Sequence, residues 1–463
     1  MLQLEKIQNI YFIGIGGIGM SALARYFNAK GKLVCGYDRT PTTLTDELIS
    51  EGIDIHFEEN ITLIPETISK PADINKVLIV YTPAIPGTNK ELKYFKENRF
   101  EVRKRADILG FITEQKYTIA VAGTHGKTTV SSMVAHIFKY AKMDCTAFLG
   151  GISKNYNTNF LFTPNKKGQV VVTEADEYDR SFLTLHPDIA VITAIDADHL
   201  DIYGDFSKME EAYRLFSGQI KENGKLIIKK GLQPGNKIQH ASITTYSLSS
   251  PADYYAENIT IENGQYIFDV ISPLGNIIAM KSGSPGLHNL ENTIAAIAVA
   301  QTMGIKTHSI KEAISSFKGV KRRFEYKIKT DKMIFIDDYA HHPAEIKACI
   351  SAVRELYPHK KITGIFQPHL YSRTRDFADE FARSLEMLDE LILLEIYPAR
   401  ELPVEGVNAK MLFDKIKLVN KQLCKKNELI GLIDKNVEVL LTLGAGDIDQ
   451  LIEPIKNKFE KNH

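Results

Sequence analysis

The sequence predicts an α/β fold of three domains built on mainly parallel sheets. A chain of 463 residues is too long for one ordinary hydrophobic core, so several domains are expected. Short apolar runs alternate with helix-like segments, which is the pattern of βαβ units. Two glycine-rich loops each follow an apolar run and open a helix-like segment, as phosphate-binding loops do.

The first domain is predicted to span residues 1–110 and to be Rossmann-like. A strand at 10–13 leads into a glycine-rich loop at 14–19, and a helix is expected from 20 to 29. Further strands are expected at 33–37 and 77–81. The loop therefore lies at a helix N-terminus, where backbone N–H groups can bind a diphosphate.

The glycine-rich loop by itself does not identify the ligand that it binds. A G-x-G-x-x-G pattern with Asp38 at the next strand end commonly binds NAD(P). A UDP-sugar also carries a diphosphate, and a glycine-rich turn without a ligand is the third reading. The candidate residues for a UDP-sugar are Gly14, Gly16, Gly17, Ile18, Gly19 and Asp38.

The second domain, expected at residues 111–322, has the stronger phosphate signal. A strand at 117–122 precedes Gly123, Thr124, His125, Gly126, Lys127, Thr128 and Thr129. Glycines let backbone N–H groups approach phosphates, Lys127 offers charge to the β- and γ-phosphates, and Thr128 offers a hydroxyl to Mg²⁺. The strict pattern has a glycine where Val121 stands, so a plain strand-to-helix turn is the alternative. The loop predicts binding of a nucleoside triphosphate.

Two strand ends nearby carry groups that suit a metal ion. Glu174 follows a strand at 169–173, and His199 follows an apolar run at 189–195. Because parallel strands end at one edge of a sheet, both groups are expected beside the phosphate loop. An isolated His199 would more often be an ordinary polar residue, but the loop and Glu174 favour a functional role. Thr128 and Glu174 are the predicted Mg²⁺ ligands, and His199 is expected at the same phosphate site.

The end of the second domain changes in pattern. Residues 254–280 look antiparallel, with a hairpin signal at Asn263-Gly264. A helix opened by residues 284–292 places Asn289 and Asn292 three residues apart on one face. Amides at this spacing could bind an adenine edge, although such residues often act as caps or are solvated.

The third domain is expected at residues 323–463. Strands at 333–336, 362–366, 391–394 and 437–443 are each followed by a polar cluster. Ligands of parallel sheets bind at those strand ends, so we expect this domain to face the ATP site of the second. Ordinary βα loops would explain one or two such clusters, but all four less well.

Composition narrows the classes of function. Lys plus Arg and Asp plus Glu number 57 each, which disfavours a nucleic acid or an acidic membrane surface as partner. The N-terminus lacks a leader pattern, and no run reaches the about 18 apolar residues that span a bilayer, so a cytoplasmic location is expected. The four cysteines have no C-x-x-C spacing, as expected for a reducing compartment.

The motifs, in their order, resemble the Mur ligase family over nearly the whole chain. They are Gly14 to Ser21, Gly123 to Thr129, Glu174 to Glu177, Asp198 to Asp201, His288 to Asn292, Arg322 to Phe324 and Asp337 to Pro343. The resemblance implies the three-domain Mur ligase architecture, with a Rossmann-like C-terminal domain that closes over the site. It also implies the first peptide-adding step of peptidoglycan synthesis, in which ATP and Mg²⁺ drive addition of L-alanine to the lactyl carboxylate of UDP-N-acetylmuramate. A monomer or weak homodimer is expected.

The resemblance also implies roles for individual residues. Lys127 would stabilise the transferring phosphoryl group, while Thr128, Glu174 and His199 would position Mg²⁺. Asn289 and Asn292 would contact the adenine, and Arg323 and Asp338 would reach the phosphate and ribose. Tyr339, His341, His369 and Arg373 match the region that orients L-alanine and the muramoyl group. Neutral His341 or His369 is a candidate for the general base.

Two departures from the family pattern limit this transfer. Leu370 stands where the family often has arginine, and the helix with Glu211 to Leu215 lacks the lysine that several related ligases carbamylate. Any second metal site would need other groups, such as Glu174 and Glu177. The alternatives are a recycling ligase that attaches a whole peptide to the same UDP-sugar, an NAD(P)-dependent oxidoreductase, and a nucleotide-sensing protein without catalysis.

Overall fold

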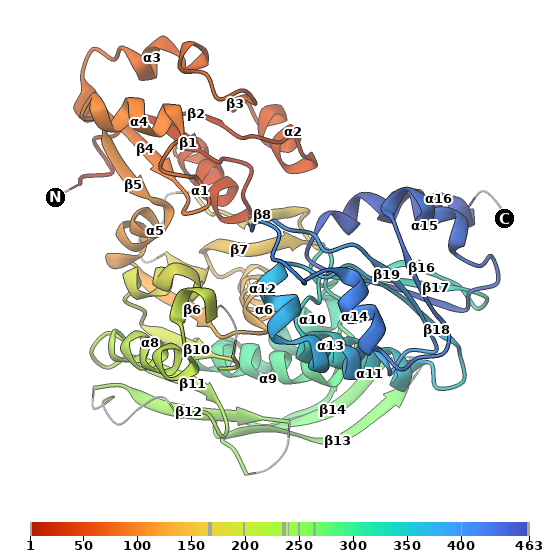
Figure 1. Ribbon diagram of the computed structural model, residues 1–463. Helices are drawn as coiled ribbons and strands as arrows, with labels where there is room; N and C mark the ends of the chain where they lie inside the picture. Colours follow the sequence, from red (N-terminus) through yellow and green to blue (C-terminus); the bar gives the residue numbers. More distant parts are fainter. Residues whose placement is uncertain are drawn as a thin grey trace. The chain divides into compact units, whose positions relative to one another are not determined.

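A computed structural model describes residues 2–164, 169–197, 200–233, 238, 240–248, 251–262, 265–399 and 401–460 (Figure 1). The described chain contains three sheets with helices packed against them, which confirms the predicted α/β class. It forms two compact units, which are described separately below. The first is Met1–Glu257, Asp269–Ile278 and Asn292–Phe317, and the second is Asn258–Phe268, Ala279–Glu291 and Lys318–His463.

The first sheet has five parallel strands in the order β3-β2-β1-β4-β5. Its elements are β1 (Asn9–Ile13), α1 (Ile18–Ala29), β2 (Leu33–Tyr37), α2 (Thr43–Ser50), β3 (Asp54–His56), η1 (Ile61–Leu63), α3 (Glu66–Ser69), η2 (Ile74–Lys76), β4 (Val77–Tyr81), α4 (Lys90–Glu97), β5 (Glu101–Lys104) and α5 (Arg105–Glu114). Side chains that alternate along β1 enter different cores: Phe12 packs with α1, whereas Tyr11 packs with Phe95 of α4. Helices therefore cover both faces, as in a doubly wound fold.

The second sheet has ten strands in the order β15-β14-β13-β12-β11-β10-β6-β9-β7-β8. The elements are β6 (Tyr117–Ala122), α6 (Lys127–Tyr140), β7 (Cys145–Ser153), β8 (Thr158–Leu161), β9 (Val170–Glu174), η3 (Tyr178–Thr184), β10 (Ile189–Ile192), α7 (Leu200–Tyr203), α8 (Phe206–Gly218), β11 (Lys225–Lys229), β12 (Ser242–Ser247), β13 (Tyr254–Glu262), β14 (Gln265–Ile271), β15 (Ile277–Lys281), α9 (Leu287–Thr302) and α10 (Thr307–Ser316). From β12 to β7 neighbouring strands are parallel, and β7 and β8 form an antiparallel hairpin. The predicted turn at Asn263-Gly264 lies outside the described residues.

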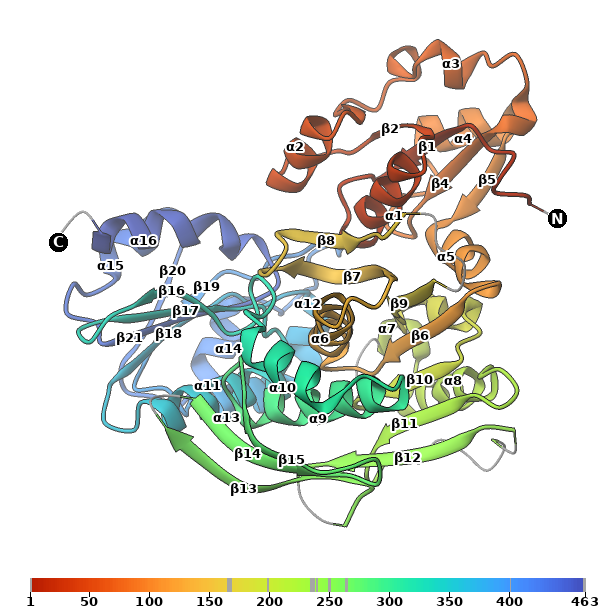
Figure 2. The same ribbon diagram turned by 180° about the vertical axis from the view of Figure 1, so that it is seen from behind.

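Two packing relationships in this unit position the candidate site. Helix α10 packs beside α6, and α1 packs on the β7–β8 hairpin (Figure 2). The second relationship joins the glycine-rich loop before α1 to the sheet that carries the phosphate loop. It rests on an aromatic cluster in which Tyr26 of α1 contacts Phe148, Phe160 and Phe162.

The third sheet has six strands in the order β16-β17-β21-β18-β19-β20, of which only β16 and β17 pair antiparallel. Its elements are β16 (Glu325–Lys329), β17 (Ile334–Asp338), α11 (Pro343–Leu356), β18 (Ile362–Phe366), α12 (Tyr371–Asp376), α13 (Ala378–Leu385), β19 (Glu390–Leu394), α14 (Ala409–Lys415), β20 (Lys421–Cys424), α15 (Lys426–Leu432), β21 (Val439–Leu443), η4 (Asp447–Leu451) and α16 (Ile452–Glu460). Ile336 faces a core with α11, α13 and α14, whereas Phe335 faces α15 and α16. The ends of β17, β18, β19 and β21 consequently lie at one edge.

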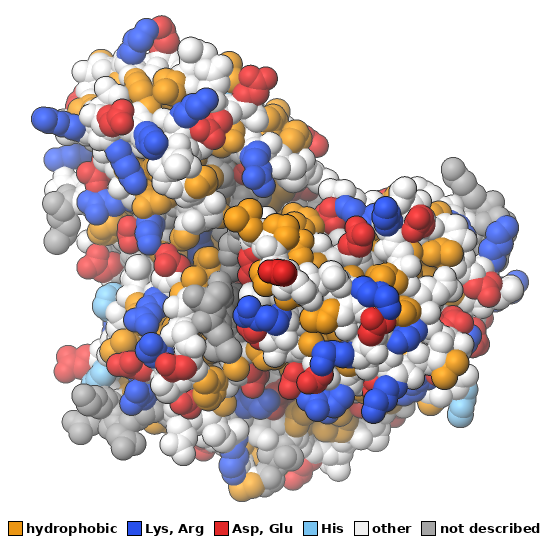
Figure 3. Space-filling model, in the orientation of Figure 1, with side chains coloured by type: hydrophobic (Ala, Val, Ile, Leu, Met, Phe, Trp, Pro, Cys, Tyr) orange, Lys and Arg blue, Asp and Glu red, His pale blue; other side chains and the backbone are white. Residues whose placement is uncertain are grey.

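The surface shows no concentration of one charge on the face drawn in Figure 3, where the described Lys and Arg side chains are mixed with Asp and Glu. Among the described helices, none combines the length and the apolar character that a membrane crossing needs. The described cysteines, Cys35, Cys145, Cys349 and Cys424, are all free and buried.

Candidate functional site

The phosphate loop connects β6 to α6 through two glycines with unusual backbone angles. Gly123 has φ +134° and Gly126, the N-cap of α6, has φ +85°. A Cβ on Gly126 would lie 2.5 Å from Oδ1 of Asn292, so both the backbone and the space require glycine. The loop thus brings Asn292 of α9 next to the N-terminus of α6, which can bind anions.

Lys127 begins α6 and is held by two acceptors. Its Nζ donates to the carbonyl oxygen of Gly123 at 2.6 Å and to Oε1 of Glu177 at 2.8 Å. The Lys127 side chain is 13% exposed and Glu177 is 1% exposed. Burial disfavours the charge on Lys127, but the carboxylates of Glu177, Glu174 and Asp176 outweigh it and raise the pKa of Lys127. The lysine is therefore a fixed cation at the helix N-terminus.

The sequence favoured Glu174 over Glu177, which was named only as a group for a second metal site. Burial raises the pKa of Glu177 to about 7, against the attraction of Lys127. The burial of Glu177 gave no sequence signal, because Glu177 lies three residues beyond β9 in a run of acidic residues. Glu177 is paired with Lys127 in this structure.

Thr128 and Glu174 lie together beside Lys127. The Thr128 hydroxyl donates to Oε2 of Glu174 at 2.9 Å, and Thr128 and Thr129 are both buried in the first turn of α6. The described residues contain no group of three or more His, Cys, Asp or Glu side chains that could hold a metal ion. Mg²⁺ usually takes one or two carboxylates together with phosphate oxygens and water, so a carboxylate and a hydroxyl fit this ion. His199 lies outside the described residues.

The segment after β10 is hydrogen-bonded to the phosphate loop. The Thr193 hydroxyl donates to the carbonyl oxygens of Ala122, at 3.1 Å, and His125. Thr124 accepts the backbone N–H of Asp196 at 3.1 Å, and Nε2 of His125 lies 3.4 Å from a carboxylate oxygen of Asp196. The apolar run predicted as a strand to residue 195 pairs only as far as Ile192, because the following backbone turns to hold this loop.

The glycine-rich loop before α1 is held by Asp38. The backbone N–H of Gly16 donates to Oδ2 of Asp38 at 2.8 Å, and Gly14 has φ +85°. A Cβ on Gly19 would lie 2.7 Å from a guanidinium nitrogen of Arg105. Helix α1 begins at Ile18, two residues before the predicted start. Asp38 therefore shapes the loop directly.

A pocket of about 250 Å³ in the first unit is lined by the glycine-rich loop before α1 and by Glu174, whose carboxylate contacts Thr128 of the phosphate loop. Its walls include Gly17 at one end, Arg105 at the side, and Gly150 and Glu174 at the other end. Arg105 also lies 3.4 Å from Asp176. Sequence reasoning missed Arg105 and Gly150, although Arg105 directly follows β5 and was therefore at a strand end. The pocket therefore leads from the glycine-rich loop before α1 to the carboxylate that accepts a hydrogen bond from Thr128.

The end of β17 in the second unit holds a buried carboxylate. Asp338 accepts the backbone N–H groups of Phe324 at 2.6 Å and Ala340 at 2.8 Å. Burial raises the pKa of Asp338 to about 6, against the charge of Arg323. The guanidinium groups of Arg322 and Arg323 each lie 5.2 Å from the ring of Tyr339. The two arginines are thus fixed on one aromatic side chain.

Two predicted histidines of this unit lie side by side. Nδ1 of His341 is 2.9 Å from the carbonyl oxygen of Tyr339 and 3.3 Å from Oε2 of Glu345. Both neighbours can accept, so Nδ1 carries the hydrogen and Nε2 is left as the basic nitrogen. The rings of His341 and His369 are 6.0 Å apart, and His369 stacks on Tyr397 at 5.8 Å.

The remaining predicted residues are placed as follows. Arg373 is buried in α12, close in sequence to Leu370, which has φ +71°. The Asn289 amide donates to the carbonyl oxygen of Pro285 at 2.6 Å, whereas Asn292 contacts the phosphate loop. Asn289 belongs to the second unit and Asn292 to the first.

Family models match three consecutive parts of the chain. Residues 9–117 match the Mur ligase family catalytic domain, 121–300 the Mur ligase middle domain, and 322–449 the Mur ligase glutamate ligase domain. The phosphate loop and Glu174 lie within the second match.

Individual proteins are similar over the whole chain. A UDP-N-acetylmuramate–L-alanine ligase of Flavobacterium psychrophilum is 51% identical and covers 99% of this chain and 100% of its own. One of Parabacteroides distasonis is 50% identical and covers 98% of both chains. The crystal structure of the UDP-N-acetylmuramate-alanine ligase MurC of Thermotoga maritima has a TM-score of 0.81 at 28% identity and covers 98% of this chain and 100% of its own. A murein peptide ligase of Psychrobacter arcticus shares the fold, with a TM-score of 0.72 at 22% identity over 98% of each chain.

Proposed function

The chain belongs to the Mur ligase family, and from that premise we propose that it joins L-alanine to the lactyl carboxylate of UDP-N-acetylmuramate at the expense of ATP. This would be the first peptide-adding step of peptidoglycan precursor synthesis. The similarity to ligases of that name over the full length supports the choice of substrates. We propose a cytoplasmic enzyme that is a monomer or weak homodimer.

One observation carries the proposal. Lys127 and Thr128 open α6 beside Glu174, and the 250 Å³ pocket leads from Glu174 to the glycine-rich loop before α1. UDP-N-acetylmuramate has a matching layout, because its sugar carries the diphosphate at one position and the lactyl carboxylate at another. An NAD(P)-dependent oxidoreductase would use the glycine-rich loop before α1, but its reaction would not require Lys127.

The chemistry follows from the poor reactivity of a carboxylate toward amines. A lactyl carboxylate oxygen attacks the γ-phosphorus of ATP, the bond from that phosphorus to the β-phosphate oxygen breaks, and ADP leaves. The resulting acyl phosphate has a good leaving group. The amine nitrogen of L-alanine attacks its carbonyl carbon, a base takes the amine proton, and the tetrahedral intermediate collapses to the amide and inorganic phosphate.

We propose that Lys127 stabilises charge on the transferring phosphoryl group. The fixed position of its ammonium group against Gly123 and Glu177 supports this role, because a cation that is already placed needs little reorganisation. Thr128 and Glu174, together with His199, would hold Mg²⁺, which supplies positive charge to the phosphate oxygens. Gly123 to Thr129, Asn289, Asn292, Arg323 and Asp338 are proposed to bind ATP.

We propose that His341 is the general base for the amine, with His369 and Arg373 holding L-alanine. The hydrogen bond of Nδ1 to the carbonyl oxygen of Tyr339 leaves Nε2 with the lone pair that a base needs. Gly14, Gly16, Gly17, Ile18 and Gly19 are proposed to bind the diphosphate, with Asp38 shaping their loop through Gly16.

The test is release of phosphate from ATP with Mg²⁺ and UDP-N-acetylmuramate, comparing L-alanine with L-Ala-γ-D-Glu-meso-diaminopimelate. Release that needs free L-alanine, with a product heavier by one alanyl residue, is the expected result. Release with the tripeptide alone would replace this proposal with the recycling ligase. Absence of release with either amine, together with binding of NADH, would favour the oxidoreductase.

A further inference from the structure

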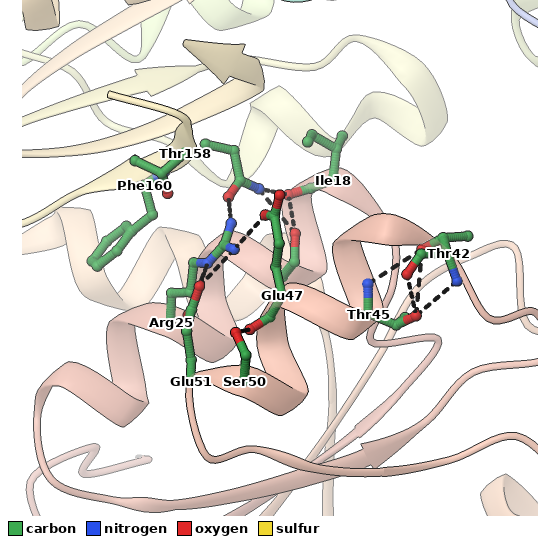
Figure 4. A network of polar contacts seen from close by, with 11 residues as sticks. Ile18, Arg25, Thr42, Thr45, Glu47, Ser50, Glu51, Thr158 and Phe160 are labelled. Carbon is green, nitrogen blue, oxygen red and sulfur yellow. Dashed lines mark hydrogen bonds and ion pairs between the residues drawn. The ribbon is translucent and has the colours of Figure 1, made fainter. Parts of the chain in front are cut away.

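A buried arginine ties the first helix to two neighbouring elements. Arg25 of α1 is 6% exposed, and its guanidinium donates to Glu47 of α2 at 3.0 Å and to Glu51, next to α2, at 2.7 Å. Its third partner is Oδ1 of Asn159 on β8, at 2.5 Å. Figure 4 shows the Arg25 side chain beside those of Glu47 and Glu51. The planar guanidinium spreads its donors in fixed directions, so these three partners determine its orientation.

Asn159 continues this network to the start of α1. The side chain has no exposed surface, and its Nδ2 donates to the carbonyl oxygen of Ile18 at 2.6 Å and to the Ser21 hydroxyl at 2.9 Å. Ser21 itself donates to the same Ile18 carbonyl. Ile18, Ser21 and Arg25 lie three and four residues apart and therefore on one face of α1. Asn159 of β8 is thus hydrogen-bonded to three residues in the first two turns of α1.

The same hairpin reaches the phosphate site at its other strand. Gly150 of β7, the antiparallel partner of β8, packs against Glu174, and a Cβ there would lie 2.5 Å from the Glu174 Cδ atom. The β7–β8 hairpin therefore contacts both ends of the 250 Å³ pocket, the α1 end through Asn159 and the other end through Gly150.

We propose that Asn159 is a positioning residue, which sets the distance between the diphosphate-binding end of α1 and the phosphoryl-transfer centre at Glu174. This inference rests on the proposed function. If the sugar nucleotide is held at α1, then a shift of α1 along the hairpin moves its carboxylate relative to the γ-phosphate. Misplacement of about 1 Å can cost roughly a hundredfold in rate.

Apolar packing alone does not supply this register. Tyr26 holds α1 on the hairpin through Phe148 and Phe160, but aromatic contacts tolerate sliding more readily than hydrogen bonds do. Buried polar networks are best attested where they specify one arrangement among several packings of similar energy. Asn159 meets this description because both ends of its amide are bonded to α1.

The experiment compares Asn159→Ala and the milder Ser21→Ala with the control Asn155→Ala in the full-length enzyme. Asn155 lies between β7 and β8 but donates to the carbonyl oxygen of Ser316, away from α1. The measurements are the thermal midpoint, the Kd values of UDP, UDP-N-acetylmuramate and ADP, and kcat and KM for the sugar nucleotide.

Asn159→Ala is expected to lower kcat/KM for UDP-N-acetylmuramate roughly 10- to 100-fold. The Kd of UDP, which reaches only the α1 end, and that of ADP should stay unchanged, so the preference for UDP-N-acetylmuramate over UDP should shrink. Ser21→Ala should cause a smaller fall in kcat/KM, again with unchanged Kd values of UDP and ADP. Asn155→Ala should leave kcat/KM unchanged.

An Asn159→Ala enzyme with normal kcat/KM and a lowered thermal midpoint would overturn the inference, because Asn159 would then serve stability alone. Equal losses of UDP, ADP and sugar-nucleotide binding would overturn it as well. A wild-type enzyme that does not use UDP-N-acetylmuramate would instead remove the proposed function, and this inference with it.

Discussion

Gly150 and Glu174 lie so close that a Cβ on Gly150 would overlap Oε2 of Glu174 and stand 2.5 Å from its Cδ atom. The Glu174 carboxylate in turn accepts a hydrogen bond from the Thr128 hydroxyl. The position of the carboxylate therefore depends on the absence of a side chain on the adjacent strand.

Gly150→Ala is expected to displace the Glu174 carboxylate and to lower kcat about a hundredfold, since misplaced groups at a phosphoryl-transfer site lose most of their effect. The thermal midpoint should change little, because Gly150 lies at the pocket wall. The control is Gly218→Ala at the end of α8, where a Cβ meets only open space. Normal turnover of Gly150→Ala would contradict the placement of Glu174 in the site.

Replacing Thr128 by valine keeps the shape of the side chain but removes the hydroxyl that donates a hydrogen bond to Glu174. The Mg²⁺ concentration for half-maximal rate should rise, because one oxygen ligand is lost. Thr128→Ser, which keeps the hydroxyl, is the matched control and should need ordinary Mg²⁺. If valine and serine variants share the wild-type requirement, Thr128 does not bind the metal.

Lys127→Met removes the cation that faces Gly123 and Glu177. We expect kcat/KM to fall by a factor that corresponds to about 3 kcal/mol or more of transition-state stabilisation. The fold should survive, because burial already raises the pKa of Glu177 to about 7 and the acid can take a proton. Lys139→Met, at the far end of α6, should keep its rate of phosphate release.

The first unit contains a buried acid whose titration should affect the free energy of unfolding. Glu91 is fully buried, accepts the Tyr11 hydroxyl at 2.7 Å and lies 3.6 Å from Nε2 of His56. Burial raises the pKa of Glu91 from 4.5 to about 7, with a smaller contribution from the charge of Glu59. The folded protein therefore binds the Glu91 proton more tightly than the unfolded chain does.

The sign of the pH effect follows. The contribution of Glu91 to the free energy of unfolding is fully present below pH 4.5 and is lost as the pH rises through 7. Glu91→Gln should remove this loss and gain about 2 to 3 kcal/mol at most relative to wild type between pH 5 and 8. Burial lowers the pKa of His56, which acts in the opposite direction, so urea unfolding of both proteins is compared at each pH. The exposed Glu66→Gln should show no such pH-dependent difference.

The proposed base can be tested through the pH profile of kcat/KM for L-alanine. His341→Gln should remove the acid limb of the profile, because the group that must be neutral is gone. Glu345→Gln should move that limb to lower pH, since a carboxylate 3.3 Å from Nδ1 favours the imidazolium form. His369→Gln should lower the rate and keep the limb. A limb that disappears in His369→Gln and persists in His341→Gln would assign the base to His369.

Several elements could be predicted closely from the sequence. The strands Leu33–Tyr37, Val77–Tyr81, Tyr117–Ala122 and Ile362–Phe366 agree with their predicted ranges. Strands buried on both faces have continuous apolar runs, and the turns after them are rich in glycine or polar residues, so their ends are visible in the sequence. The contact of Thr128 with Glu174 also follows from this logic, because β6 and β9 are parallel neighbours.

Other features depend on contacts between distant residues and had no local signal. Gly150 looks like any glycine in a strand until the neighbouring Glu174 is placed, and Asn159 looks like an ordinary polar residue of a hairpin. The pairing of Lys127 with Glu177 had no sequence signal, because three acidic residues follow β9 within five positions and spacing alone does not select one of them.

The requirement for glycine at two positions also bears on drug resistance. A side chain at Gly126 would enter the space of Asn292, and one at Gly150 would enter that of Glu174. An inhibitor that packs against these two glycines would meet a surface that escape mutations could not reshape without disabling the enzyme. Compounds anchored there should select resistance through altered expression or efflux rather than through changes in the binding site.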